Sequence, residues 1–182
     1  MSRGKVILEG ARFQLTIERL CRQLIENYGD FTDTCLIGIQ QNGIPLTDRI
    51  AHRLRELIPG VRFDDGKLDV TFYRDDFRHR EKSLAGNATV INFLVENKRV
   101  ILIDDVLYTG RTIHAAMTAL QDFGRPSKVE LLAMIDRRFN RHMPIHSDYV
   151  GMSVDSLDEA YVKVEWKEKD GADRIRLYSK VN

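Results

Sequence analysis

The sequence predicts an α/β fold in a single domain, residues 1–182, with a central parallel sheet flanked by helices. Short apolar runs alternate along the chain with segments whose apolar residues recur at helical spacing. The run from Val100 to Ile103 is continuously apolar, as in a strand buried on both faces of a parallel sheet. It ends in two adjacent acids, Asp104 and Asp105, and open α/β sheets bind their ligands at this end of a strand.

The composition gives no indication of a nucleic-acid-binding, secreted or membrane protein. The chain is 43% hydrophobic and 30% charged with a net charge of +1, so charge alone predicts no attraction to nucleic acid or membranes. The two cysteines, Cys21 and Cys35, have no metal-binding spacing, which is typical of a reduced cytoplasmic protein. No run is long and apolar enough to span a membrane, and no secretory apolar core is present, so no membrane partner is expected.

The first half of the chain is expected to alternate helices and strands. Its elements are a short apolar start at 6–8, a core-facing helix at 11–28, a buried strand at 35–39, a helix at 46–58 and a strand at 68–73. Asn42 and Gly43 lie in a turn that can take positive φ. The polar stretch at 74–87 has no periodicity, which predicts either a solvated loop or a cationic flap over an anionic substrate.

The second half continues the alternation. A helix at 113–123 ends at Gly124, and Pro126 follows. A buried strand is expected at 129–135, then an irregular segment at 139–149. The alternating residues of 162–166 and 175–177, with a turn at Asp170 and Gly171, predict a β-hairpin.

The loop after the two acids has the composition of an anion cradle. Its backbone N–H groups, its two threonine hydroxyls and the start of the next helix can bind a phosphate, and the acids can accept hydrogen bonds from a sugar diol. The loop residues are Val106, Leu107, Tyr108, Thr109, Gly110, Arg111 and Thr112. The alternative is a buried strand, an N-capped helix and two incidental surface acids.

The segment 100–112 resembles the phosphoribosyl pyrophosphate (PRPP) signature of type I phosphoribosyltransferases. With the segments 68–76, 124–127 and 144–151, nearly the whole chain is similar to the bifunctional pyrimidine operon attenuation protein/uracil phosphoribosyltransferase family. The resemblance implies a flexible flap and a small base-binding hood with a C-terminal hairpin. It also implies conversion of uracil and PRPP to UMP and pyrophosphate, UMP-dependent binding to leader mRNA of pyrimidine operons, and a homodimer or homotetramer.

The same resemblance implies roles for individual residues. Asp104 and Asp105 would hold the ribose hydroxyls, with Mg²⁺ nearby and bound mainly through PRPP and water. Arg74 would contribute catalytic positive charge, and the loop at 106–112 would hold the 5′-phosphate. Gln41, Asn42 and Gly43 would form the pyrophosphate loop. Relatives commonly have Thr-Arg-Gly there, so the neutral Asn42 should weaken pyrophosphate binding.

Uracil would bind at Ile135, Asp136 and Arg137, with Val162 nearby and Asp136 as the candidate base. Arg137 could equally serve as an ion-pair partner of Asp136 or a neighbour. The candidate RNA contacts are Arg19, Arg22, Arg138, Arg141 and His146. Glu18, Asn27, Asn140, His146 and Met152 disfavour RNA binding, since lost phosphate contacts weaken binding steeply at physiological salt.

Two other functions stay open. One is a nucleotide-sensing, RNA-binding attenuation regulator with little or no catalysis, which Asn42 would permit. The other is a phosphoribosyltransferase for another base, such as hypoxanthine. The Tyr73-Arg74-Asp75-Asp76 segment at the start of the flap and the hood favour uracil over that base.

Overall fold

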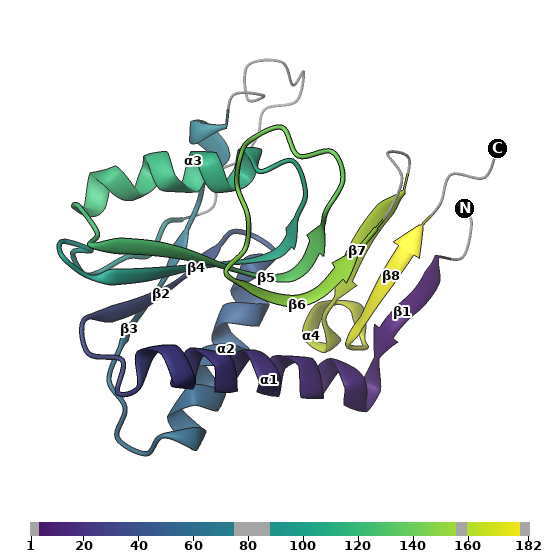
Figure 1. The fold of residues 1–182 in the computed structure, drawn as a ribbon, viewed down its shortest axis with the longest axis horizontal. Helices are drawn as coiled ribbons and strands as arrows, with labels where there is room; N and C mark the ends of the chain where they lie inside the picture. Colours follow the sequence, from purple (N-terminus) through teal and green to yellow (C-terminus); the bar gives the residue numbers. More distant parts are fainter. Residues whose placement is uncertain (1–3, 75–87, 156–159, 179–182) are drawn as a thin grey trace.

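The computed structural model describes residues 4–74, 88–155 and 160–178 (Figure 1). The expected flap therefore lies outside the described residues, apart from Arg74 at its start. None of the helices within these ranges has the length and apolar character needed to cross a membrane.

A five-stranded sheet forms the centre of the molecule, and all of its pairings are parallel. Its strand order is β3-β2-β4-β5-β6. The strands are β2 (Thr34–Ile39), β3 (Asp64–Leu68), β4 (Arg99–Leu107), β5 (Lys128–Arg137) and β6 (Tyr149–Val154). The predicted central parallel sheet is thus confirmed, with β4 in the middle.

Helices cover both faces of this sheet (Figure 1). α1 (Gly10–Tyr28) and α2 (Gly43–Leu57) lie on one face, and α3 (Arg111–Leu120), followed by a 3-10 turn at Gln121–Phe123, lies on the other. Successive residues of β4 join opposite cores: Ile101 and Ile103 pack with α1 and α2, while Leu102 packs with α3. Burial on both faces explains why this strand is continuously apolar.

A second, three-stranded antiparallel sheet stands beside the first, in the order β1-β8-β7. Its strands are β1 (Lys5–Glu9), β7 (Tyr161–Glu165) and β8 (Arg174–Tyr178). The predicted hairpin is confirmed, because Val162 pairs with Leu177 and Val164 with Ile175. A short helix, α4 (Lys167–Asp170), connects its strands, and β1 joins at the outer edge of β8.

The strand predicted at 68–73 is largely wrong. β3 ends at Leu68, and a 3-10 turn spans Thr71–Tyr73. Asp69 Oδ1 accepts a hydrogen bond from the Thr71 N–H at 2.7 Å, which bends the backbone out of the sheet. The side chains of Phe72 and Tyr73 are 64% and 41% exposed, so the β-forming alternation there does not mark a half-buried strand surface.

Candidate active site

Two carboxylates lie at the C-terminal edge of the central strand. β4 pairs with β2 only as far as Ile103, whereas its pairing with β5 continues to Leu107. Asp104 and Asp105 therefore lie within β4, beside the point at which β2 has ended. The sequence predicted this edge correctly and ended the strand too early, because it stopped at the last apolar residue.

Both carboxylates are buried, with exposed fractions of 7% and 8%. Loss of water around the pair raises the pKa of Asp105 to about 6. Burial, and then the charge of Asp105, raises the pKa of Asp104 well above its ordinary value. Cations oppose these shifts: Arg74 lowers the pKa of Asp104, and Lys169 of α4 lowers that of Asp105. Such a pair can accept hydrogen bonds from hydroxyls or from the water shell of a cation.

The loop between β2 and α2 approaches the acids from one side. A Cβ on Gly43 would overlap the carbonyl oxygen of Ile103 and lie 3.1 Å from the Cα of Asp104. Asn42 has φ −86°, and Gly43 is not among the residues with positive φ, so the expectation of positive φ is wrong. Glycine is required at 43 because the two backbones pass so closely. The peptide bond between Gln40 and Gln41 is cis.

The loop between β4 and α3 surrounds the other side. Gly110 precedes α3 with φ +88°, the left-handed region that glycine adopts readily. The carbonyl oxygen of Thr109 accepts the N–H groups of His142 and Met143 at 2.9 and 3.0 Å. Arg74 donates from Nη1 to Thr112 Oγ1 at 3.3 Å. The predicted catalytic arginine is thus beside the predicted phosphate loop and the acids.

Arg141 ties this loop to the end of β5. Its Nη1 donates to the carbonyl oxygen of Tyr108, and its Nη2 forms an ion pair with Asp136. The guanidinium of Arg137 lies over the Tyr108 ring, 3.8 Å from the ring centre. Sequence reasoning placed Arg141 among RNA contacts and missed this position. No local pattern marks it, because its partners are 33 and 5 residues away.

The other residues expected around the base are core residues. Ile135 is fully buried and Val162 is 4% exposed, and both belong to the core that packs on α1 and α2. Their side chains therefore act as apolar packing groups of this core. The polar groups of this end of β5 come from Asp136 and Arg137.

The arginines predicted to contact RNA are engaged within the protein. Arg22 pairs with Glu18 at 3.0 Å, and Arg138 pairs with Asp155. Arg19 donates from Nη2 to the carbonyl oxygens of Val150 and Gly151 at 3.0 and 2.6 Å, which connects α1 to β6. His146 is exposed.

Metal ligands are few in this region. Within residues 4–74, 88–155 and 160–178, no group of three or more His, Cys, Asp or Glu side chains could enclose a metal ion. The two neighbouring carboxylates suit a hard cation that keeps most of its water and takes its remaining ligands from a phosphate.

Comparison with known proteins gives a consistent result. The profile of the phosphoribosyl transferase domain matches residues 4–169. The bifunctional protein PyrR of Bacillus mycoides is 36% identical over 99% of this chain and 100% of its own length. The bifunctional protein PyrR of Microcystis aeruginosa is 42% identical over 94% of this chain and 95% of its own length.

Solved structures share the fold. A hypoxanthine phosphoribosyltransferase of Staphylococcus aureus superimposes with a TM-score of 0.69 at 22% identity, covering 94% of this chain and 89% of its own. The Trypanosoma cruzi hypoxanthine phosphoribosyl transferase superimposes with a TM-score of 0.73 at 15% identity, covering 97% and 93%.

Proposed function

Because this chain belongs to the phosphoribosyl transferase domain family, we propose that it is a uracil phosphoribosyltransferase. It would transfer the phosphoribosyl group of PRPP to uracil N1 and release pyrophosphate, with the N1 proton lost to solvent or a base. The buried Asp104–Asp105 pair beside the 106–112 loop is the observation that carries this proposal. It joins a diol-binding group to a phosphate-binding loop at one sheet edge.

The residues would divide the substrate between them. The backbone N–H groups of 109–112 would hold the 5′-phosphate, with the Thr112 hydroxyl and Arg74 beside it. Asp104 and Asp105 would accept hydrogen bonds from the ribose hydroxyls, and their charge would stabilise the positive charge that develops at C1. Mg²⁺ would neutralise the pyrophosphate of PRPP when bound. Gln41, Asn42 and Gly43 would meet the pyrophosphate from the opposite loop.

Uracil would lie under Tyr108 and the end of β5, where Asp136 and Arg137 are near. The similarity to the pyrimidine attenuation family across nearly the whole chain supports this base. The hypoxanthine enzymes, at 22% identity or less, share the fold and do not bear on the base.

Steady-state UMP formation from uracil, PRPP and Mg²⁺ tests the proposal, with hypoxanthine offered in parallel. We expect uracil turnover that Asp105→Asn abolishes or reduces by at least about 100-fold. Turnover of hypoxanthine but not of uracil would show that hypoxanthine, and not uracil, is the substrate base. PRPP binding without turnover of either base would favour a nucleotide-sensing regulator.

A second role is suggested by relatives that are called bifunctional. We propose that α1 and the segment after β5 bind pyrimidine-operon leader mRNA in response to UMP, in a cytoplasmic dimer or tetramer. Since Arg22 and Arg138 already pair with acids, few free cations face a phosphate backbone, so we expect a shallow salt dependence. Filter binding at several salt concentrations, with sedimentation of the same samples, tests this; no binding with UMP present would remove the role.

A further inference from the structure

The proposed pyrophosphate loop, residues 41–43, has no cationic side chain, although a cation would strengthen the binding of pyrophosphate. Gln41, Asn42 and Gly43 supply backbone N–H groups and neutral side chains. A leaving pyrophosphate carries several negative charges, and charged donors hold phosphate oxygens more strongly than neutral ones. A cation from elsewhere in the fold could complete the subsite.

Lys169 of α4 is placed to do this. It lines a hollow of about 340 Å³ together with Pro45 and Asp48 from the first turns of α2. Pro45 lies two residues beyond Gly43, whose backbone passes against Ile103 and Asp104. Lys169 also acts electrostatically on Asp105. Lys169 thus borders the start of α2, and its positive charge acts on Asp105 of the acid pair.

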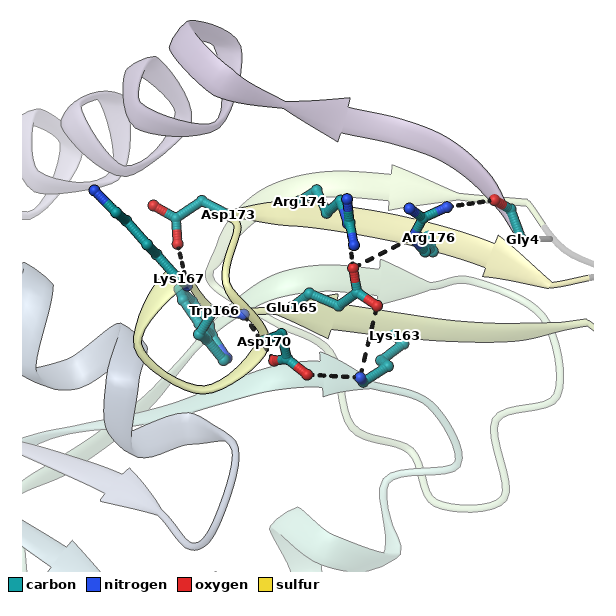
Figure 2. A network of polar contacts seen from close by, with 9 residues as sticks. All are labelled: Gly4, Lys163, Glu165, Trp166, Lys167, Asp170, Asp173, Arg174 and Arg176. Carbon is teal, nitrogen blue, oxygen red and sulfur yellow. Dashed lines mark hydrogen bonds and ion pairs between the residues drawn. The ribbon is translucent and has the colours of Figure 1, made fainter.

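The turn that carries Lys169 is held firmly (Figure 2). Asp170 accepts the Trp166 N–H at 3.0 Å and pairs with Lys163 at 2.8 Å. Asp173 accepts the Lys167 N–H at 2.8 Å, which closes the turn from its other end. Such bracing fixes the backbone from which the Lys169 side chain extends.

The acids near Lys169 pair with other cations, so the Lys169 ammonium group is available to bind an anion. Arg49 of α2 is occupied by Glu168 and Asp173 at 2.8 and 2.7 Å, and Lys163 by Asp170. Lys169 is exposed and, among the described residues, its ammonium group forms no hydrogen bond or ion pair. A long, solvated side chain at this position can reach a polyanion above the acids.

We propose that Lys169 is a pyrophosphate-binding residue, supplying from the second sheet the positive charge that Asn42 does not provide in the loop. The inference rests on the proposed phosphoribosyl transfer and adds a residue to that site. The hairpin of the second sheet would thereby take part in binding the leaving group as well as in shaping the hood.

Calorimetric titration with Mg²⁺–PRPP, and separately with Mg²⁺ and inorganic pyrophosphate, tests the role without uracil. Lys169→Met is expected to weaken both affinities about tenfold or more, the contribution of a charged hydrogen bond. Lys169→Arg should keep most of the affinity. In kinetic assays the KM for PRPP should rise while the KM for uracil and the melting temperature stay unchanged.

Lys167→Met is the matched control. Lys167 is an exposed lysine of the same turn, two residues away and thus on a different side of the helix. Asn42→Arg should restore affinity in the Lys169→Met protein and improve the parent protein much less. Equal effects of the two lysine substitutions, or equal gains from Asn42→Arg in both backgrounds, would overturn the proposal.

The outcomes distinguish failure of the Lys169 proposal from failure of the proposed uracil phosphoribosyltransferase activity. A parent protein that binds Mg²⁺–PRPP but forms no UMP removes the proposed reaction, and the binding data still decide the role of Lys169. UMP formation with no effect of Lys169→Met overturns Lys169 alone. A parent protein that binds neither PRPP nor pyrophosphate overturns both.

Discussion

At the scale of single residues, burial of Asp104 and Asp105 lowers the stability of the fold at neutral pH. Both side chains are buried, and the pKa of Asp105 is raised to about 6 by that burial. At neutral pH the fold therefore holds negative charge where water stabilises it poorly. Ligand hydroxyls and cations would restore part of the lost hydration.

The raised pKa gives a pH-dependent prediction for stability. Folded Asp105 holds its proton up to about pH 6, whereas an unfolded aspartate loses it near pH 4, so rising pH destabilises the fold across this window. At pH 7.5 we expect Asp105→Asn to raise the free energy of unfolding by about 2 kcal/mol. Urea unfolding should show a much smaller gain at pH 4.5.

Asp48→Asn serves as the control, because the Asp48 side chain is 58% exposed and its carboxylate is 3.9 Å from the Lys67 ammonium group. Its effect on stability should be small at either pH. A gain from Asp105→Asn that is the same at pH 4.5 and 7.5 would contradict the assigned cause.

Gly43 gives a second prediction at this scale. Alanine there would force its Cβ into the Ile103 carbonyl, so α2 or β4 must shift, at a cost of about 1–3 kcal/mol. PRPP affinity should fall as well, since the loop lies against Asp104. Gly60→Ala is the comparison: Gly60 has φ +83° with no atom near its Cβ, so it tests backbone strain alone. Chemical unfolding and PRPP titration of both variants measure the difference.

The sequence was sufficient to place those candidate site residues that are close along the chain. The acid pair, the loop of 106–112 and Gly43 lie together as predicted, because strand, turn and helix signals place them at one sheet edge. The positions of Arg141 and Lys169 could not be predicted. Their places depend on contacts between segments far apart in sequence, and single lysines and arginines on polar stretches carry no such information.

At the scale of helices and strands, apolar periodicity in the sequence predicted the elements that are strongly buried. α1, α2 and the central strand were predicted from apolar spacing, since each buries a full face. β6 was missed: Gly151 and Ser153 interrupt its apolar pattern, and Gly151 is required because its backbone passes against Met134. β3 was displaced because its residues, Asp64 to Leu68, are mostly polar, and it is defined by backbone hydrogen bonds to β2 and, at Lys67, to Val90.

Arg141 gives the prediction for the loop between β4 and α3. Arg141→Ala should free the Tyr108 carbonyl and leave the part-buried Asp136 unpaired, lowering the free energy of unfolding by about 1–3 kcal/mol. The KM for PRPP should rise, because the phosphate loop loses a support. Arg138→Ala is the matched control: its ion pair with Asp155 is about half exposed on both sides, so stability should change little. Thermal unfolding of both variants distinguishes them, and equal losses would contradict the assignment.

In the whole molecule, the second sheet is held against the helices that cover the first. Arg49 of α2 pairs with Glu168 and Asp173, and its guanidinium lies 5.0 Å from the centre of the Trp166 ring. The Trp166 ring in turn contacts Phe13 of α1, with ring centres 5.5 Å apart. The second sheet is therefore anchored on both helices of one face.

Arg49→Met should loosen this anchor and lower the free energy of unfolding by about 2 kcal/mol, since Asp173 is largely buried. Arg55→Met is a close control. Arg55 lies on the same helix, pairs with Asp65 and covers the Phe63 ring, but both side chains of its ion pair are more than a third exposed. Urea unfolding, with hydrogen exchange at the amides of β8, should show a larger effect for Arg49→Met. Equal effects of the two substitutions would show that Arg49 does not anchor the second sheet.

The pairing of β1 with β8 has a consequence for how the protein is made. Lys5 lies opposite Leu177, so β1 is synthesised long before β8, the strand with which it pairs. The strands of the five-stranded sheet are all synthesised in that interval, and they can pair while β1 is still without its neighbour. Because contacts so distant in sequence form slowly, the turn that carries Lys169 is expected to take its place last. A nascent chain would thus place the acid pair at its sheet edge well before the hairpin of the second sheet could join it.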